Sequence, residues 1–227
     1  MSVRAVILPA TPLLVPGVAG MADVLDDVRD AVREALAEIV MGGRRPLVVA
    51  HGEALRHGRM RPSLAAVGVA DTWLRIPDFR GHREVPQRSE DTSGGGGARR
   101  SPWEPHLPVA GVGASVALMC LAEVLGEQAG AVETLELPPA WSDQPGISAG
   151  GESEARAAAV GHLMAADGLV VAGGGVPGGL LTDPGALAPG VAEALAAVGA
   201  EWTPEVRVLP QSHDHLPPEY RVTLLRG

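Results

Sequence analysis

The residues best suited to chemistry in this sequence are a histidine and a carboxylate that follow a short apolar run. His51 and Glu53 come directly after residues 46–50, PLVVA, and stand two positions apart. At the end of a strand this spacing places both side chains near the mouth of a site, where imidazole and carboxylate can transfer protons or bind a metal ion. His51 and Glu53 are therefore the candidate catalytic residues. A structural histidine held by a backbone hydrogen bond is the alternative interpretation of His51.

A second group of candidate ligands lies near the carboxyl terminus. His213 and His215 flank Asp214 in a proline-rich stretch, and imidazole and carboxylate are common donors to zinc and iron. A surface loop is the alternative interpretation. No Ser-His-Asp arrangement or nucleophile elbow can be recognised. Four further histidines have no partner that the sequence reveals: His57, His82, His106 and His162.

A glycine-rich stretch, GGGVPGG at 173–179, offers a backbone site instead. It lacks the Lys-Ser/Thr pair of a phosphate loop and the GxGxxG spacing of a dinucleotide site. A tight turn with close packing is the first expectation, and an anion held by backbone N–H groups is the alternative. The candidate ligand-binding residues are Thr11, His51, Gly174 and Gly175.

Three apolar runs must position these groups, at 3–8, 46–50 and 168–172. Each predicts a fully buried strand, and the amphipathic segment 22–40 predicts a helix that joins the first two as a right-handed βαβ unit. The carboxyl ends of parallel strands meet at one edge of a sheet. We therefore expect three chain segments to converge there: 9–16, 51–53 and 173–179.

The remaining pattern predicts an α/β protein with three αβα layers and a mainly parallel central sheet. Further elements are expected as helices at 62–67, 113–126, 152–167 and 189–198, and as strands at 73–76, 131–137, 206–209 and 219–225. The last strand is expected to close the sheet or lie at its edge, and helix 152–167 is expected to bury Ala157, Val160, Leu163 and Met164. The chain is interpreted as a single domain, 1–227, with a mobile insertion at 81–108, which has almost no apolar content.

Composition restricts the classes of partner. The net charge of −9 argues against nucleic acid, although residues 41–101 carry 11 arginines against 6 acidic residues, a local charge of +5. A solvated surface is the expectation for this Arg-rich segment, and an anion or partner site is the alternative.

The only cysteine, Cys120, lies in an apolar helical run, which predicts a buried thiol, no internal disulfide and a cytoplasmic location. The apolar stretch 109–125 falls short of a membrane span, so no membrane association is expected.

Three motifs together resemble the class III extradiol ring-cleavage dioxygenases, the LigB-like superfamily, and in particular an uncharacterised actinobacterial branch of it. They are ILPATPLLVP at the amino terminus, VVAHGE after the second apolar run, and GLVVAGGGVPGGLLTDPGALAPGVAEAL towards the carboxyl terminus. The resemblance implies a LigB-like fold and a non-haem Fe(II) site. In active members a histidine in a His-x-Pro-like loop, a second after the next strand and a third that closes a glycine-rich pattern supply the imidazoles.

This sequence departs from that pattern at two of the three positions. Pro9, Ala10 and Thr11 occupy the first, and Gly178 occupies the third, while only His51 matches. Iron-dependent oxygen chemistry needs at least three protein ligands. The resemblance therefore implies a LigB-like protein that has lost its metal centre, with no cofactor expected.

Three hypotheses follow, and they leave open whether the protein is an enzyme. The first is a re-purposed protein that binds a small molecule or a partner. The second is a metal-dependent enzyme with Fe(II) or Zn(II) held by His51, Glu53, His213 and His215. The third is a homo-oligomer that pairs through an edge strand.

Overall fold

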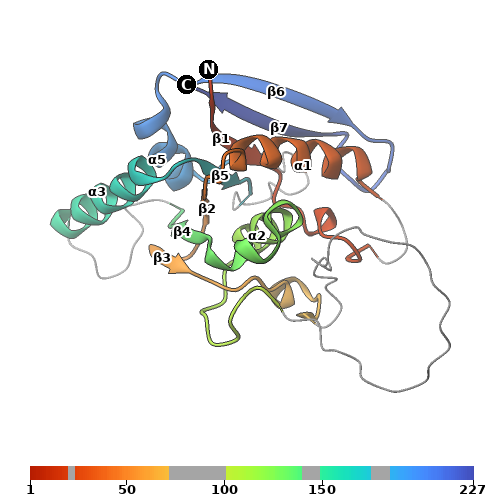
Figure 1. Cartoon of the computed structure of the whole chain (residues 1–227), viewed down its shortest axis with the longest axis horizontal. Helices are drawn as coiled ribbons and strands as arrows, with labels where there is room; N and C mark the ends of the chain where they lie inside the picture. The colour runs from red at the N-terminus through yellow and green to blue at the C-terminus, as the bar shows by residue number, and fades with distance from the viewer. Residues whose placement is uncertain (20–23, 72–100, 140–148, 175–184) are drawn as a thin grey trace.

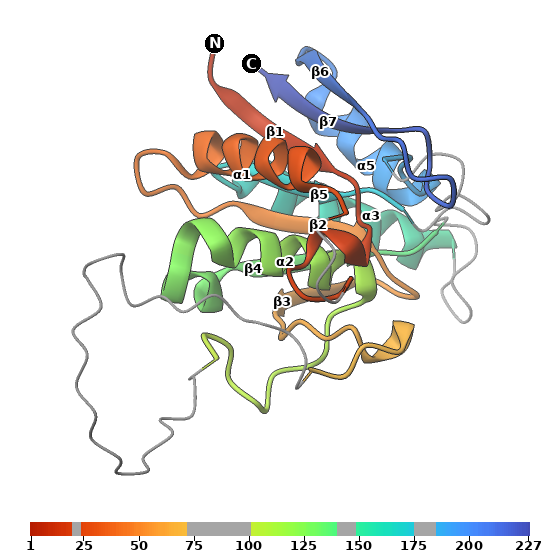
Figure 2. The same ribbon diagram turned by 90° about the vertical axis from the view of Figure 1, so that its right-hand side faces the viewer.

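The computed structural model describes residues 1–19, 24–71, 101–139, 149–174 and 185–227, and of 149–150 only the backbone. One seven-stranded sheet has helices on both faces (Figures 1 and 2). The strands are β1 (Val3–Leu8), β2 (Leu47–His51), β3 (Arg56–Arg59), β4 (Glu133–Leu137), β5 (Leu169–Ala172), β6 (Thr203–Pro210) and β7 (Glu219–Arg226). The helices are α1 (Asp26–Val40), α2 (Val112–Leu125), α3 (Ala149–Ala165) and α5 (Pro189–Gly199), with 3₁₀ helices η1 (Pro12–Leu14), η2 (Ala65–Val67) and η4 (Gly126–Ala131).

The sheet is mixed, with the strand order β3-β4-β2-β5-β1-β7-β6. Its four central strands, β4, β2, β5 and β1, run parallel, as the sequence predicted. The three outer strands are antiparallel to their neighbours. The predicted edge or closing strand, β7, lies between β1 and β6, and β6 forms the edge. Because β7 returns alongside β1, the backbones of Ser2 and Gly227 exchange two hydrogen bonds of 3.1 Å.

Small aliphatic side chains form two core layers. Helices α1 and α2 cover one face of the sheet, and α3 and α5 cover the other. Helix α1 buries a stripe at helical spacing that includes Val28, Val32 and Leu36, while α2 buries every residue from Ala114 to Ala122. Cys120 is among them, and burial raises the pKa of its thiol, which agrees with a structural cysteine.

Helix α3 packs with a different face from the one predicted. Leu163 is buried as expected, but Ala157 is exposed and Met164 is 74% exposed. The inward stripe contains Ala159 and Leu163. The helix sequence is rich in alanine and glycine, so its apolar residues surround it and give little indication of which side faces the sheet.

The edge strand β3 was missed because its sequence, RHGR, contains no apolar residue. It pairs antiparallel with β4, which places Arg56 opposite Glu136 and Arg59 opposite Glu133. Opposite charges at facing positions stabilise an antiparallel pair.

The predicted strand 73–76 lies outside the described residues, and in the predicted helix 62–67 only the 3₁₀ turn η2 forms.

The predicted mobile insertion 81–108 is misplaced at its carboxyl end. Residues 101–108 are described, and the Trp103 side chain is 5% exposed within the first core layer. Residues 81–100 lie outside the described part of the chain. The chain passes so close to Gly130 that a Cβ atom there would lie 2.0 Å from the Pro102 carbonyl oxygen.

The helical stretch Val112–Ala131, which joins α2 to η4, is longer than the sequence suggested. Its 20 residues are apolar enough to cross a membrane by length and composition. In the fold, however, α2 lies against the sheet and α1. A core helix of an α/β domain satisfies the same criteria.

Candidate ligand-binding site

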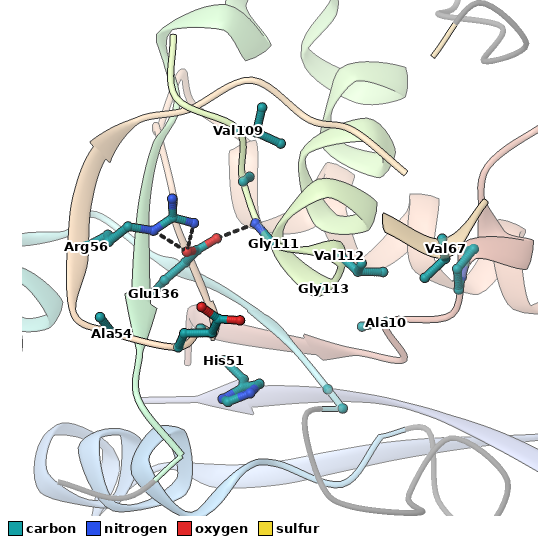
Figure 3. Close-up of a pocket in the computed structure, with 16 residues that line it drawn as sticks. Ala10, His51, Ala54, Arg56, Val67, Val109, Gly111, Val112, Gly113 and Glu136 are labelled. Carbon is teal, nitrogen blue, oxygen red and sulfur yellow. Dashed lines mark hydrogen bonds and ion pairs between the residues drawn. The ribbon is translucent and has the colours of Figure 1, made fainter. Parts of the chain in front are cut away.

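Three strand ends meet in a cleft at the carboxyl edge of the parallel strands, as the sequence predicted (Figure 3). Residues 10 and 12 follow β1, residues 51–53 are the last residue of β2 and the two after it, and residues 173–174 follow β5, which lies between those two strands. The cleft has a volume of about 540 Å³. The beginning of α2 and apolar side chains such as Val67 and Val109 complete its lining.

A buried carboxylate that the sequence did not reveal lies in this cleft. Glu136 of β4 is fully buried and accepts a hydrogen bond of 2.8 Å from Arg56 Nε, a second from Arg56 Nη2, and one of 2.6 Å from the Gly111 N–H (Figure 3). Burying a carboxylate is costly unless it is paired and hydrogen-bonded, and here both conditions are met. Two glycines, Gly52 and Gly111, leave room for the Glu136 side chain to lie against the backbone. A Cβ on Gly52 would lie 2.8 Å from Glu136 Cβ, and one on Gly111 would lie 3.2 Å from its Oε1.

The Glu136 carboxylate also changes the electrostatics of the α2 terminus. The first N–H groups of a helix carry partial positive charge, and Gly111 is the N-cap of α2. Glu136 already supplies the negative group there, and Arg56 balances its charge. Among the described residues that line the cleft, no positive charge is therefore left uncompensated to attract an anion.

His51 presents an unused hydrogen-bonding atom. Its Nδ1 is buried and has no hydrogen-bond partner among the described residues, although the side chain as a whole is partly exposed. A buried polar atom without a partner costs free energy. Because His51 lines the cleft, a turn of its ring that brings Nδ1 to a bound ligand would recover that cost.

The other predicted ligand-binding residues have mixed outcomes. Gly174 lines the cleft, with a φ of +99° that favours glycine, and its N–H donates to the Ala186 carbonyl at 2.6 Å. Thr11 does not line it: its hydroxyl caps η1 by accepting from Leu13 N at 3.4 Å, and the residue is 7% exposed. Glu53 is exposed at the rim. Gly175 and Gly178 lie outside the described residues.

The structure does not bring the predicted second metal cluster to His51. His213 lines a different cleft, with the segment 24–28 at the start of α1, and neither His213 nor His215 lines the cleft of His51. Within the described ranges, no group of three or more His, Cys, Asp or Glu side chains is placed to hold a metal ion.

The described donors do not fit the iron site that the resemblance implies. Ala10, in the loop that would carry the first imidazole, contributes a methyl group that a Cβ on Gly113 would contact at 3.5 Å. Glu136 is already bound by Arg56 and Gly111. One imidazole and the rim carboxylate Glu53 remain, which is fewer ligands than a non-haem iron site requires.

No family model matches the chain. No curated protein and no solved structure matches it either. The interpretation of the cleft therefore depends on its own geometry and on the sequence motifs.

Two histidines that had no visible partner in the sequence stack beside the amino ends of β2 and β4, at the ends of the strands opposite the cleft of His51. The rings of His57 in β3 and His162 in α3 have centroids 3.7 Å apart and planes inclined by 23°, and His57 Nε2 lies 3.4 Å from Glu133. They line a smaller cleft together with Arg45 and Asp167. His106, in turn, lies 3.0 Å from Glu104.

The stacked pair predicts a loss of stability in mild acid. Burial and the neighbouring His162 lower the pKa of His57 below its ordinary value of 6.5, and these effects outweigh the opposing effect of Glu133. The unfolded chain therefore binds the His57 proton more tightly than the folded chain does. The stability that neutral His57 contributes is complete at pH values above the pKa of the unfolded chain, and it is lost as pH falls through the pKa of the folded chain. We expect the free energy of unfolding, measured in urea, to decrease between about pH 7 and pH 5, and to decrease less in His57→Gln. An equal decrease in both proteins would contradict this assignment.

Proposed function

We propose that this chain is a LigB-like protein that has lost the Fe(II) dioxygenase site and binds a small molecule in the cleft at the carboxyl ends of β1, β2 and β5. The observation that carries the proposal is a largely apolar cleft of about 540 Å³ lined by His51, whose buried Nδ1 has no hydrogen-bond partner among the described residues. Clefts of this size with few polar groups are typical of small-molecule sites. The sequence motifs support the LigB-like assignment, and the parallel centre of the sheet is compatible with it.

The chemistry of the lining indicates the class of ligand. Arg56 and Glu136 neutralise each other, and Glu136 also occupies the positive end of α2. The carboxylate at the rim, Glu53, would repel an anion. We therefore infer a neutral, mainly apolar molecule with one polar group that hydrogen-bonds the His51 imidazole. The unpaired, buried Cys120 supports a cytoplasmic location, and the negative net charge disfavours nucleic acid.

A fragment screen tests this proposal. A mixture of neutral aromatic and aliphatic fragments and their carboxylate analogues should be examined by ligand-observed NMR. We expect the neutral fragments to bind, and we expect Val109→Trp, which fills the cleft mouth, to weaken them at least about tenfold. The matched control is Met41→Trp at a residue 65% exposed outside the cleft, which should bind normally. Preference for the carboxylates, or equal binding by both variants, would contradict the proposal.

Metal content distinguishes this function from a rebuilt metal enzyme. Natively purified protein should contain iron and zinc well below one equivalent by inductively coupled plasma mass spectrometry. Stoichiometric metal that disappears in His51→Ala would instead support an extradiol dioxygenase-like oxidoreductase centred on His51.

A further inference from the structure

The edge strand β6 carries a pattern of backbone and side-chain groups that is complementary to itself. It is the last strand of the sheet, and no described element lies beyond it (Figures 1 and 2). Val206 and Val208 are each 50% exposed. Such an edge is a template for another strand unless it is blocked.

The backbone donors of the open edge can be identified from the pairing of β6 with β7. The Gln211 N–H donates to the Pro218 carbonyl at 3.1 Å, next to the pair formed by Pro210 and Glu219. In an antiparallel ladder the direction alternates, so odd-numbered residues of β6 face β7 and even-numbered residues face outward. The outward positions are Pro204, Val206, Val208 and Pro210.

Proline has no N–H, so Val206 and Val208 carry the only outward donors of β6. Prolines at strand edges usually limit pairing. Here they stand at positions 204 and 210 and leave the segment between them open. Any partner strand must therefore use this short central segment.

The charges on β6 select the partner and the register. Glu205 and Arg207 point to the face covered by α1, where Arg207 contacts Glu34 at 2.8 Å. If two copies of β6 pair antiparallel with Val206 opposite Val206, each Glu205 faces the other copy's Arg207. Val208 N–H then donates to the Pro204 carbonyl of the other copy, so every outward donor has an acceptor. A register shifted to bring Arg207 opposite Arg207 would place like charges together, which is unfavourable.

We propose that β6 is a homodimer interface, in which two copies of this chain pair antiparallel about Val206 and join their sheets into one. The two-fold axis closes the contact, so it forms a discrete dimer and uses both β6 edges. This surface is separate from the ligand-binding cleft and does not depend on its function.

Disulfide trapping tests the register directly. Cα atoms of a hydrogen-bonded antiparallel pair lie about 5.5 Å apart, within the range that a disulfide spans. We expect Val206→Cys to form a covalent dimer under mild oxidation that dithiothreitol reverses. The native Cys120 is buried and should not interfere. The matched control is Thr223→Cys, which lies opposite Val206 on β7 and would be about 14 Å from its copy across the dimer.

A pair of charge variants tests the same interface without cysteine. Glu205→Arg and Arg207→Glu each place like charges across the dimer, so each should dissociate about tenfold more readily than the wild type in sedimentation equilibrium. Mixed together, they should form a heterodimer, since arginines of one then face glutamates of the other. Circular dichroism would confirm that both remain folded. A monomeric wild type up to about 0.1 mM, equal trapping at positions 206 and 223, or no heterodimer on mixing would each overturn the proposal.

Discussion

Replacing Arg56 with alanine is expected to lower the free energy of unfolding by about 3 kcal/mol, measured by urea denaturation. The reason is an asymmetry within its ion pair. The Glu136 side chain is 0% exposed, whereas that of Arg56 is 44% exposed. Removing the arginine leaves a buried carboxylate with the Gly111 N–H as its remaining described partner, while removing the carboxylate leaves a guanidinium that water can reach.

The comparison with Glu136→Gln isolates that asymmetry. The amide keeps an acceptor for the Gly111 N–H and removes the buried charge, so its cost should be only about 1 kcal/mol. The double variant Arg56→Ala with Glu136→Gln should be more stable than Arg56→Ala alone, because no unpaired charge is then buried. If Arg56→Ala costs no more than Glu136→Gln, the carboxylate is not held as the structure indicates.

Gly130→Ala is expected to destabilise the protein by a similar amount, about 3 kcal/mol. The added Cβ would lie 2.0 Å from the Pro102 carbonyl oxygen, and a backbone atom cannot move aside as a flexible side chain can. The segment would have to shift, and with it the adjacent Trp103, which is buried in the core. Urea denaturation followed by circular dichroism would measure the loss of stability.

The same substitution at Gly161 is a control that should change the free energy of unfolding in the opposite direction. Gly161 lies inside α3, and a Cβ there would meet nothing within 4 Å. Alanine is the better helix former by about 1 kcal/mol, so Gly161→Ala should stabilise the protein. Equal effects at the two positions would show that close packing at Gly130 does not control stability.

The buried centre of the fold could be predicted because its residues form continuous apolar runs. Strands β1, β2 and β5 and helix α1 lie where those runs predicted them. Because these strands end at the same edge of the sheet, His51, Ala10 and Gly174 line one cleft. The edges could not be predicted in the same way. Strand β3 has no apolar residue, and β6 extends beyond its predicted range through polar positions.

Glu136 was missed for a related reason. In the sequence ETLEL, alternation assigns Thr134 and Glu136 to a solvent-facing side, but β4 lies inside the sheet with α2 on that side. A signal was present in the arginine of RHGR, which could be matched to this carboxylate only once the pairing of β3 with β4 was known. Thr11 was predicted to bind a ligand but caps a helix instead, because a threonine before a proline suits either role.

The mutual hydrogen bonds of Ser2 and Gly227 have a practical consequence for handling the protein. Both residues lie beside the amino end of β1, whereas the cleft follows its carboxyl end. An affinity tag or surface tether fused at either extremity would emerge from the side remote from the cleft. A short peptide linker across the two extremities would circularise the polypeptide with little distortion of β1 or β7.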